Sequence, residues 1–235
     1  MTDGPWRPTL LLVHGAWHGA WCWEKLTSVL RAEGWRTRMV DLPSAGRQSG
    51  VQDDARTIRA ELESIDGPTV VVAHSYGGIP VTQATAEAGN VAHIVYLAAF
   101  QLDIGESLLS FSGAPVPDQP GDLEAVPEDP VALFYGDVAR PEAEEAAKRL
   151  VPQSTRSFAD AVTQAGWHTV PSTYIVCESD QALPAQIQEK LAARADTVHR
   201  IASGHSPFLS KPVELAALLA AIGDSVQAHM NGRTS

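Results

Sequence analysis

Short apolar runs separated by amphipathic stretches recur along most of the chain. Residues 68–74, Pro-Thr-Val-Val-Val-Ala-His, are rich in β-branched side chains and present no polar face. Near-continuous apolar runs of this length are typical of parallel strands that helices cover on both sides. We predict a strand in this run and in five others of similar type, at 9–14, 35–42, 91–98, 172–177 and 197–201.

Helical patterns fill most of the intervals between these runs, at 20–32, 51–65, 76–88, 185–194 and 212–229. Strands that alternate with helices of this length indicate βαβ units. The pattern therefore predicts an α/β fold with a mostly parallel sheet and helices on both faces. A chain of 235 residues is of a size that such folds often accommodate in one domain.

The segment 101–153 breaks the alternation. Five prolines, at 115, 117, 120, 127 and 130, exclude regular structure from its first half, whereas 141–150 is a charged amphipathic helix. Long insertions in compact α/β domains are usually functional, and ligands bind at the carboxyl edge of such sheets. We therefore predict a core of 1–100 and 154–235 with a cap at 101–153. A disordered loop is the alternative, but the apolar residues at 133–135 argue against it.

Composition narrows the classes of partner. The chain has 28 acidic and 17 basic residues, a net charge of −11, and no cluster of Lys or Arg, which disfavours binding to nucleic acid or an anionic membrane. Its apolar stretches fall short of the ~20 residues of a membrane span, and no signal peptide is evident, so we expect a cytoplasmic protein. Cys22 and Cys177 lie in apolar stretches without metal-ligand spacing. They are expected to be buried thiols, and no metal is predicted.

A serine follows the most apolar strand directly. Residues 73–77 read Ala-His-Ser-Tyr-Gly, which fits the nucleophile-elbow pattern G-x-S-x-G with alanine in the first position. The turn from strand to helix is sharp, so the residues two before and two after the serine must be small. The free N–H groups and dipole of the following helix favour an oxyanion beside the serine. We predict Ser75 as the nucleophile; a helix-capping serine is the alternative.

The loop after the first strand, 14–21, reads His-Gly-Ala-Trp-His-Gly-Ala-Trp and would lie beside this elbow. An oxyanion hole needs two N–H donors, one from the residue after the nucleophile and one from such a loop. We predict Tyr76 and Ala16 as the donors, with Trp17 as the alternative to Ala16. His14 is interpreted as a structural brace of the loop.

The base and the acid are expected after the last two strands. His205 lies in Ser-Gly-His-Ser-Pro-Phe, 203–208, where glycine and proline predict a tight turn that projects the imidazole over the sheet. Asp180 follows the run 172–177, and the order Ser75, Asp180, His205 matches that of this kind of triad. The carboxylate would fix the imidazole tautomer. Glu178, Asp103 and a helix-capping role for Asp180 remain open.

Together these residues resemble the compact α/β-hydrolases of the plant methylesterase and hydroxynitrile-lyase group and their bacterial esterase relatives. The resemblance spans nearly the whole chain, through 14–16, 19–23, 41–43, 73–78, 133–135, 152–154, 180–184 and 204–208. It implies an α/β-hydrolase fold, a Ser-His-Asp triad, no cofactor, and a small cap that shapes an apolar pocket.

Two positions separate the branches of that group. The lyases carry threonine after the loop histidine and lysine after the catalytic histidine, where this chain has Gly15 and Ser206. Both differences favour hydrolysis over C–C cleavage.

We therefore expect a serine hydrolase that acts on small neutral carboxylic esters through an acyl-enzyme. The expected pocket residues are apolar: Trp17, Leu108, Phe111, Phe134 and Phe208. A lyase on the same triad and a slow or non-catalytic small-ligand receptor are the alternatives. A homodimer is also open, because caps in this group can carry dimer contacts.

Overall fold

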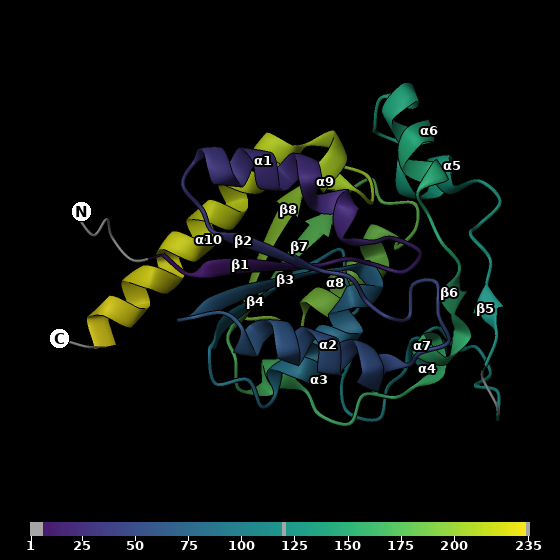
Figure 1. Ribbon diagram of the computed structural model, residues 1–235, viewed down its shortest axis with the longest axis horizontal. Helices are drawn as coiled ribbons and strands as arrows, with labels where there is room; N and C mark the ends of the chain where they lie inside the picture. Colours follow the sequence, from purple (N-terminus) through teal and green to yellow (C-terminus); the bar gives the residue numbers. More distant parts are fainter. Residues whose placement is uncertain (1–6, 119–120, 234–235) are drawn as a thin grey trace.

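The computed structural model describes residues 7–118 and 121–233 (Figure 1). Within them, one sheet has the strand order β2-β1-β3-β4-β7-β8, and every neighbouring pair is parallel. The strands are β1 (Thr9–Val13), β2 (Thr37–Val40), β3 (Thr69–His74), β4 (Val91–Leu97), β7 (Ser172–Cys177) and β8 (Thr197–Ile201). The predicted strands and their parallel arrangement are confirmed.

Helices cover both faces of the sheet (Figure 1). One layer holds α1 (Glu24–Ala32), α9 (Pro207–Ser210) and α10 (Pro212–Arg233), and the other holds α2 (Val51–Glu63), α3 (Gly78–Thr85) and α8 (Ala185–Ala192). Two 3₁₀ turns, η1 (Ala20–Trp23) and η2 (Ser75–Gly77), precede α1 and α3. The predicted helices therefore exist, but the first residues of two of them form tighter turns.

The central strand β3 shows why its sequence has no polar side. Val70 and Val72 pack into the core on the side of α1 and α10, whereas Val71 and Ala73 pack into the core on the side of α2 and α3. Successive side chains of a strand point to opposite faces, so a strand between two helical layers must be apolar at every position. This buried strand fixes the position of the turn that follows it.

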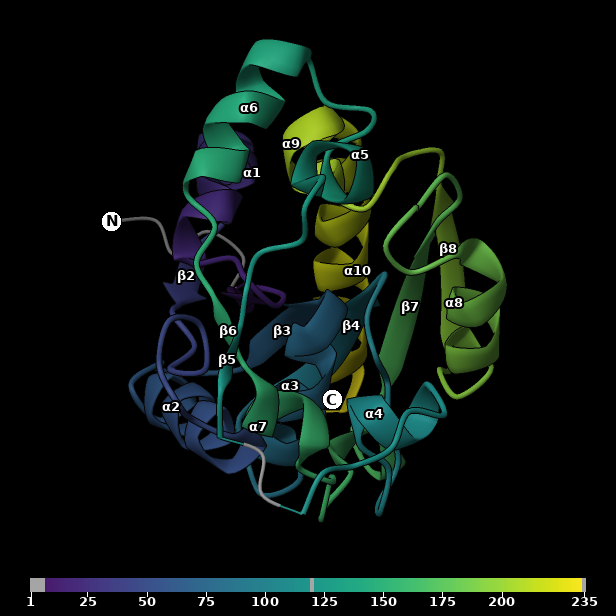
Figure 2. The ribbon, with the colours of Figure 1, turned by 90° about the vertical axis from the view of Figure 1, so that its right-hand side faces the viewer.

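The segment 101–153 crosses the carboxyl edge of the sheet (Figure 2). Its described part contains α4 (Leu108–Phe111), β5 (Leu123–Glu124), α5 (Pro130–Phe134) and α6 (Arg140–Lys148). It returns to the core through β6 (Gln153–Ser154), which pairs with β5, followed by α7 (Thr155–Ala159) and the 3₁₀ turn η3 (Gly166–His168). The amphipathic helix predicted at 141–150 is confirmed as α6, whereas the short elements α4 and β5 contradict the expectation that the first half of the segment has no regular structure.

Candidate active site

Ser75 occupies the turn between β3 and α3 with a positive φ of 52°. Such a conformation is uncommon for a residue with a side chain and marks local backbone strain. Two glycines allow the tight turn. A Cβ on Gly77 would lie 2.5 Å from the carbonyl oxygen of His14, and one on Gly78 would lie 2.6 Å from that of Phe100. The turn therefore packs directly against the end of β1 and the chain that follows β4.

His205 and Asp180 form a buried hydrogen-bonded pair beyond the ends of β8 and β7. The Nδ1 of His205 lies 2.7 Å from Oδ2 of Asp180, and the two side chains are 2% and 0% exposed. Oδ1 of Asp180 accepts the backbone N–H groups of Ala182 and Leu183, both at 2.8 Å, and Gln188 donates to Oδ2 at 3.0 Å. These donors fix the orientation of the carboxylate, which accepts from Nδ1 and leaves Nε2 of His205 free to take a proton.

The two other candidate acids lie away from His205. Asp103 pairs with His168, with Oδ1 and Nε2 2.9 Å apart, and Glu178 is exposed. Asp180 is therefore the carboxylate that the fold brings to His205. Its backbone bonds close the turn at Ala182 and Leu183, whereas α8 begins after Pro184 without a side-chain cap, so the alternative helix-capping role is not what the geometry shows.

His74 joins the serine turn to the loop of His205. Its Nε2 donates to the carbonyl oxygen of His205 at 2.8 Å, and the two imidazole centroids are 4.5 Å apart. Burial lowers the pKa of His74 well below its usual value, so this ring is neutral. Within the described chain, the hydroxyl of Ser75 makes no hydrogen bond. The hydrogen bond between a nucleophilic serine and its histidine is often long in free enzymes and shortens when substrate binds.

The loop after β1 is held by two histidines. His14 donates from Nδ1 to the carbonyl of Gly15 at 2.8 Å, and its Nε2 accepts the N–H of Leu42 at 3.0 Å. Because a trans peptide points its C=O and N–H in opposite directions, this bond directs the N–H of Ala16 away from His14. The N–H of Ala16 has no backbone partner among the described residues, whereas that of Trp17 donates to Oε1 of Gln153 at 3.1 Å.

His18 connects the same loop to the insertion. Burial lowers its pKa to about 3, so the ring is neutral. Its Nδ1 donates to the carbonyl of Ala16 at 2.8 Å, which leaves Nε2 to accept the hydroxyl of Tyr135, also at 2.8 Å. A residue at the end of α5 therefore helps to set the backbone of this loop.

Comparison with known sequences supports the family that these features indicate. Residues 10–218 match a family model described as "Alpha/beta hydrolase family". The chain belongs to the alpha/beta hydrolase family. The resemblance and the fold class predicted from the sequence are both confirmed.

Several relatives of this alpha/beta hydrolase are named as esterases. Methylesterase 7 of Arabidopsis thaliana is 30% identical over 248 residues, and the match covers 91% of this chain and 95% of the relative. A carbendazim hydrolyzing esterase of Nocardioides sp. (strain SG-4G) is 27% identical, with 91% and 98% covered. The crystal structure of a methylesterase from Arabidopsis has a TM-score of 0.78 at 28% identity, with 92% and 98% covered.

A buried polar network in this alpha/beta hydrolase links the serine turn to the loop after β1. The hydroxyl of Tyr76 donates to Oδ2 of Asp54 at 2.6 Å, and the backbone N–H of Ser44 donates to Oδ1 at 3.0 Å. Burial raises the pKa of Asp54 to about 6. Gln153 donates to the hydroxyl of Ser44 at 2.9 Å and accepts the N–H of Trp17. The network therefore ties together the two segments from which oxyanion donors are predicted.

This network was missed from the sequence, although one signal was available. Asp54 lies on the face of α2 that buries Val51, Ala55, Ile58 and Leu62. A carboxylate on the apolar side of a helix needs buried partners. The pattern identifies such an anomaly, but it does not say which residue supplies the partner.

The expected pocket residues separate into three groups. Phe134 packs near His205 with ring centroids 5.8 Å apart, and Trp17 lies at the same distance from Phe134. Leu108 and Phe111 are half-buried on α4 and border the core cluster on the side of α2 and α3.

Phe208 is fully buried instead of open to a pocket. Its ring packs on Trp23 and His74, with centroids 4.7 Å and 4.9 Å away, respectively. It therefore supports His74 from the core, a role that the sequence position alone did not suggest.

A cavity of about 180 Å³ adjoins His205. It lies between the insertion and the loops that carry Asp180 and His205, and its lining is Ala132, Leu133, Gly136, Asp137, Ser179, Gln181, Gly204 and His205. Among the described residues, no group of three His, Cys, Asp or Glu is suited to hold a metal ion, and no helix is long and apolar enough to cross a membrane. Cys22 and Cys177 are buried free thiols, as predicted.

Proposed function

We propose that this alpha/beta hydrolase is a serine esterase that hydrolyses small neutral carboxylic esters. The observation that carries the proposal is the buried His205–Asp180 hydrogen bond beside the strained turn of Ser75. A hydroxyl at a tight turn, an imidazole of fixed tautomer and a carboxylate are the parts of a nucleophilic acyl-transfer site. The names of the relatives, methylesterase and carbendazim hydrolyzing esterase, support an ester as the substrate.

In the proposed mechanism, Nε2 of His205 takes the proton of Ser75 as Oγ attacks the acyl carbon. Asp180 stabilises the imidazolium that forms. The N–H groups of Tyr76 and Ala16 hold the oxyanion, and Ala16 is preferred to Trp17 because the N–H of Trp17 already donates to Gln153. His205 then protonates the leaving alcohol, and water hydrolyses the acyl-enzyme by the same steps.

The proposed substrate is small and neutral because of the groups around His205. Aromatic rings approach it from Phe134 and, beyond that, Trp17. The adjoining cavity has no Lys or Arg in its lining, and the chain carries a net charge of −11. An acidic protein without a local cation repels an anionic ester.

Hydrolysis is favoured over a lyase reaction by residues in contact with the site. A Cβ on Gly15 would lie 2.9 Å from the Cβ of Ser75, so the threonine of the lyases does not fit here without movement. Ser206 replaces the lysine of the lyases and is fully buried. A hydroxyl in that position supplies no charge for cyanide.

The test compares wild type with Ser75→Ala and His205→Ala on p-nitrophenyl acetate. We expect each substitution to lower kcat by at least about 10³-fold, because each removes an essential part of the triad. A fluorophosphonate should label wild type at Ser75 and leave Ser75→Ala unlabelled. Esterase activity of Ser75→Ala within tenfold of wild type would reject the proposal.

A further inference from the structure

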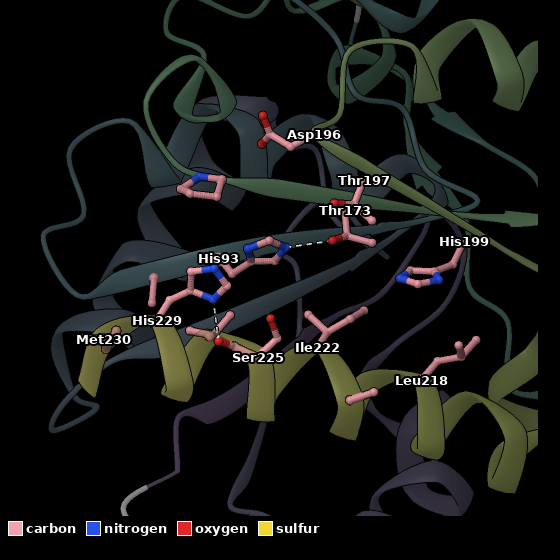
Figure 3. A pocket seen from close by; sticks show the side chains of 14 residues that line it. His93, Thr173, Asp196, Thr197, His199, Leu218, Ile222, Ser225, His229 and Met230 are labelled. Atoms are coloured by element: carbon pink, nitrogen blue, oxygen red, sulfur yellow. Dashed lines mark hydrogen bonds between the residues drawn. The ribbon is translucent and has the colours of Figure 1, made fainter. Parts of the chain in front are cut away.

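Figure 3 shows a second cavity, of about 480 Å³. Its lining includes the first residues of three strands, whereas Ser75 follows the last residue of β3, so the cavity lies at the opposite end of the parallel sheet. It is a groove between α10 and the first residues of β4, β7 and β8. Its volume falls within the range of about 300–1,000 Å³ that is typical of small-molecule sites. The proposed triad and oxyanion donors contribute nothing to its lining, so the groove is separate from the esterase site.

The two walls of this groove differ in chemistry. The helix wall has an apolar stripe of Leu218, Ile222 and Val226, which follow one another at intervals of one turn of α10, and it becomes polar at Ser225 and His229. The sheet wall is polar and carries His93, Thr173, Thr197 and His199. Layers of a fold normally pack apolar face on apolar face. Here the sheet side offers the helix mostly polar side chains, with Ala92 and Pro171 as the apolar exceptions, and a groove stays open between them.

Along β7 and β8, the side chains on the groove face change abruptly from polar to apolar. Thr173 is followed on the same face of β7 by Ile175, and His199 is followed on β8 by Ile201. Both isoleucines belong to the core cluster that includes α10. The polar wall is thus confined to the strand beginnings, where it faces the groove instead of the core.

Several polar groups of the groove have free hydrogen-bonding capacity. His93 uses Nε2 to bond the hydroxyl of Thr173 at 2.8 Å, and burial lowers its pKa to about 4, so the ring is neutral. His229 donates Nδ1–H to the carbonyl of Ser225 at 2.8 Å, and its Nε2 has no partner among the residues that the structure describes (Figure 3). The ring of His199 makes no hydrogen bond within the part of the chain that the structure describes.

The charge around the groove selects against anions. Asp196 is part of the lining, and no Lys or Arg is. The whole chain has a net charge of −11, which adds a repulsive field for a negative ligand. A ligand without charge can satisfy the imidazoles by hydrogen bonds and meets no such penalty.

We propose that this groove binds a neutral, flat aromatic molecule of two or three rings that carries a hydrogen-bonding group. The ring system lies against Leu218, Ile222 and Val226. The hydrogen-bonding group faces the imidazoles of His93 and His199. The groove is therefore a second small-molecule site, distinct from the one where the ester is cleaved.

The probe for this proposal is N-phenyl-1-naphthylamine, a neutral aromatic amine whose fluorescence rises in apolar surroundings. Its sulfonated counterpart, 8-anilinonaphthalene-1-sulfonate, has the same rings and a negative charge. Fluorescence titration should give saturable one-to-one binding of the amine, and binding of the sulfonate should be at least about tenfold weaker because the field of the protein opposes an anion.

Two alanines of α10 give matched variants for locating the probe. Ala221 and Ala217 are both exposed and lie one turn apart, but only Ala221 lines the groove. Ala221→Trp should weaken binding of the amine by at least about tenfold, whereas Ala217→Trp should change it by less than about twofold. Ser225→Trp, at another exposed lining position, should repeat the effect of Ala221→Trp and replaces that variant if it does not fold.

The other outcomes overturn the proposal. Absence of saturable binding shows that the groove does not select such a molecule. Unchanged affinity in folded Ala221→Trp and Ser225→Trp places the probe elsewhere, for instance in the ester site. Equal or tighter binding of the sulfonate contradicts the choice of a neutral ligand.

Discussion

At the scale of single residues, the polar side chains near Ser75 are held by hydrogen bonds to partners both near and distant in the chain. Asp180 receives two backbone N–H groups and a side-chain amide in addition to His205. The ring of His14 hydrogen-bonds the carbonyl of Gly15 and the backbone N–H of Leu42, and so joins the loop after β1 to the chain that follows β2. These contacts fix ring tautomers and peptide planes before any substrate binds, which is the preorganisation that acyl transfer requires.

The role of Asp180 can be tested with an isosteric change. Asp180→Asn keeps the shape but presents an amide to His205, so the ring no longer donates Nδ1–H to a charged carboxylate. We expect kcat for p-nitrophenyl acetate to fall roughly 10³–10⁴-fold. Glu178→Gln, at an exposed neighbouring position, is the control and should keep wild-type kcat. A loss of less than tenfold in Asp180→Asn would assign the acid to another residue.

The sequence was sufficient to identify candidate site residues, but it did not predict their hydrogen-bond partners or their packing. Ser75, Asp180 and His205 stand out because each follows a predicted strand at a turn, and their assignment to catalysis stays a prediction. The hydrogen bond between Tyr76 and Asp54 could not be derived, because the two residues belong to different helices whose packing the pattern does not specify. Phe208 was misleading for a similar reason: an apolar residue near a catalytic turn can face the core or the pocket.

At the scale of elements, the hydrophobic pattern of the sequence was sufficient to predict the strands of the sheet but not the conformation of the turns. The buried strands were evident because both faces are apolar, as in β3. The helix expected at 76–88 instead begins with the 3₁₀ turn η2 and becomes α-helical only over Gly78–Thr85. That difference arises from the strained backbone of Ser75, a local conformation that no hydrophobic pattern encodes.

The junction of β3, η2 and the loop after β1 leaves no room for a methyl group. A Cβ on Gly77 would lie 2.5 Å from the carbonyl oxygen of His14 and 3.1 Å from that of Val13. Backbone atoms cannot move aside as a flexible side chain can, so Gly77→Ala should displace the loop that carries Ala16. We expect kcat to fall at least about 10²-fold, as after loss of one oxyanion donor.

The matched control for that change is Gly89→Ala, because a Cβ at Gly89 would meet no atom within 4 Å. It should leave both kcat and the melting temperature close to those of wild type. Wild-type kcat in Gly77→Ala would show that the turn tolerates the shift and that its packing does not matter for catalysis.

The insertion contacts the loop after β1 through Tyr135, whose hydroxyl donates to His18. Tyr135→Phe leaves a buried imidazole nitrogen without its donor and loosens the Ala16–Trp17 peptide, whose carbonyl His18 holds; this peptide adjoins the one that carries the N–H of Ala16. We expect kcat to decrease about tenfold or more with little change in KM, because the affected N–H acts mainly in the transition state. Tyr96→Phe also removes one buried hydroxyl, which bonds Thr82 in the core, and should lower stability without lowering kcat. Equal kcat in the two variants would contradict the proposed link.

At the scale of the whole molecule, buried histidines make stability depend on pH. Burial lowers the pKa of His14, His18, His74 and His93, so the folded chain keeps all four neutral where the unfolded chain takes up protons. Below the unfolded value of about 6.5, the unfolded state therefore binds more protons, and stability falls as pH falls. Each such proton contributes about 1.4 kcal/mol per pH unit, so the free energy of unfolding should decrease steeply between pH 6.5 and 4.5.

Asp54 acts in the opposite direction within the same pH range. Its pKa is about 6 in the folded chain against 3.8 for a free carboxyl, so between these values the folded state binds the extra proton. Its contribution is fully present below pH 3.8 and is lost as pH rises through about 6.

Asp54→Asn removes the titration of this side chain and keeps its shape. Relative to wild type, the variant should therefore gain up to about 3 kcal/mol of unfolding free energy between pH 4 and 6.5. Urea unfolding of both proteins across this range measures the difference, with Glu63→Gln on the exposed face of α2 as the control. A gap between Asp54→Asn and wild type that stays constant with pH would mean that Asp54 is ionised throughout, and that Tyr76 and Ser44 stabilise its charge more than burial opposes it.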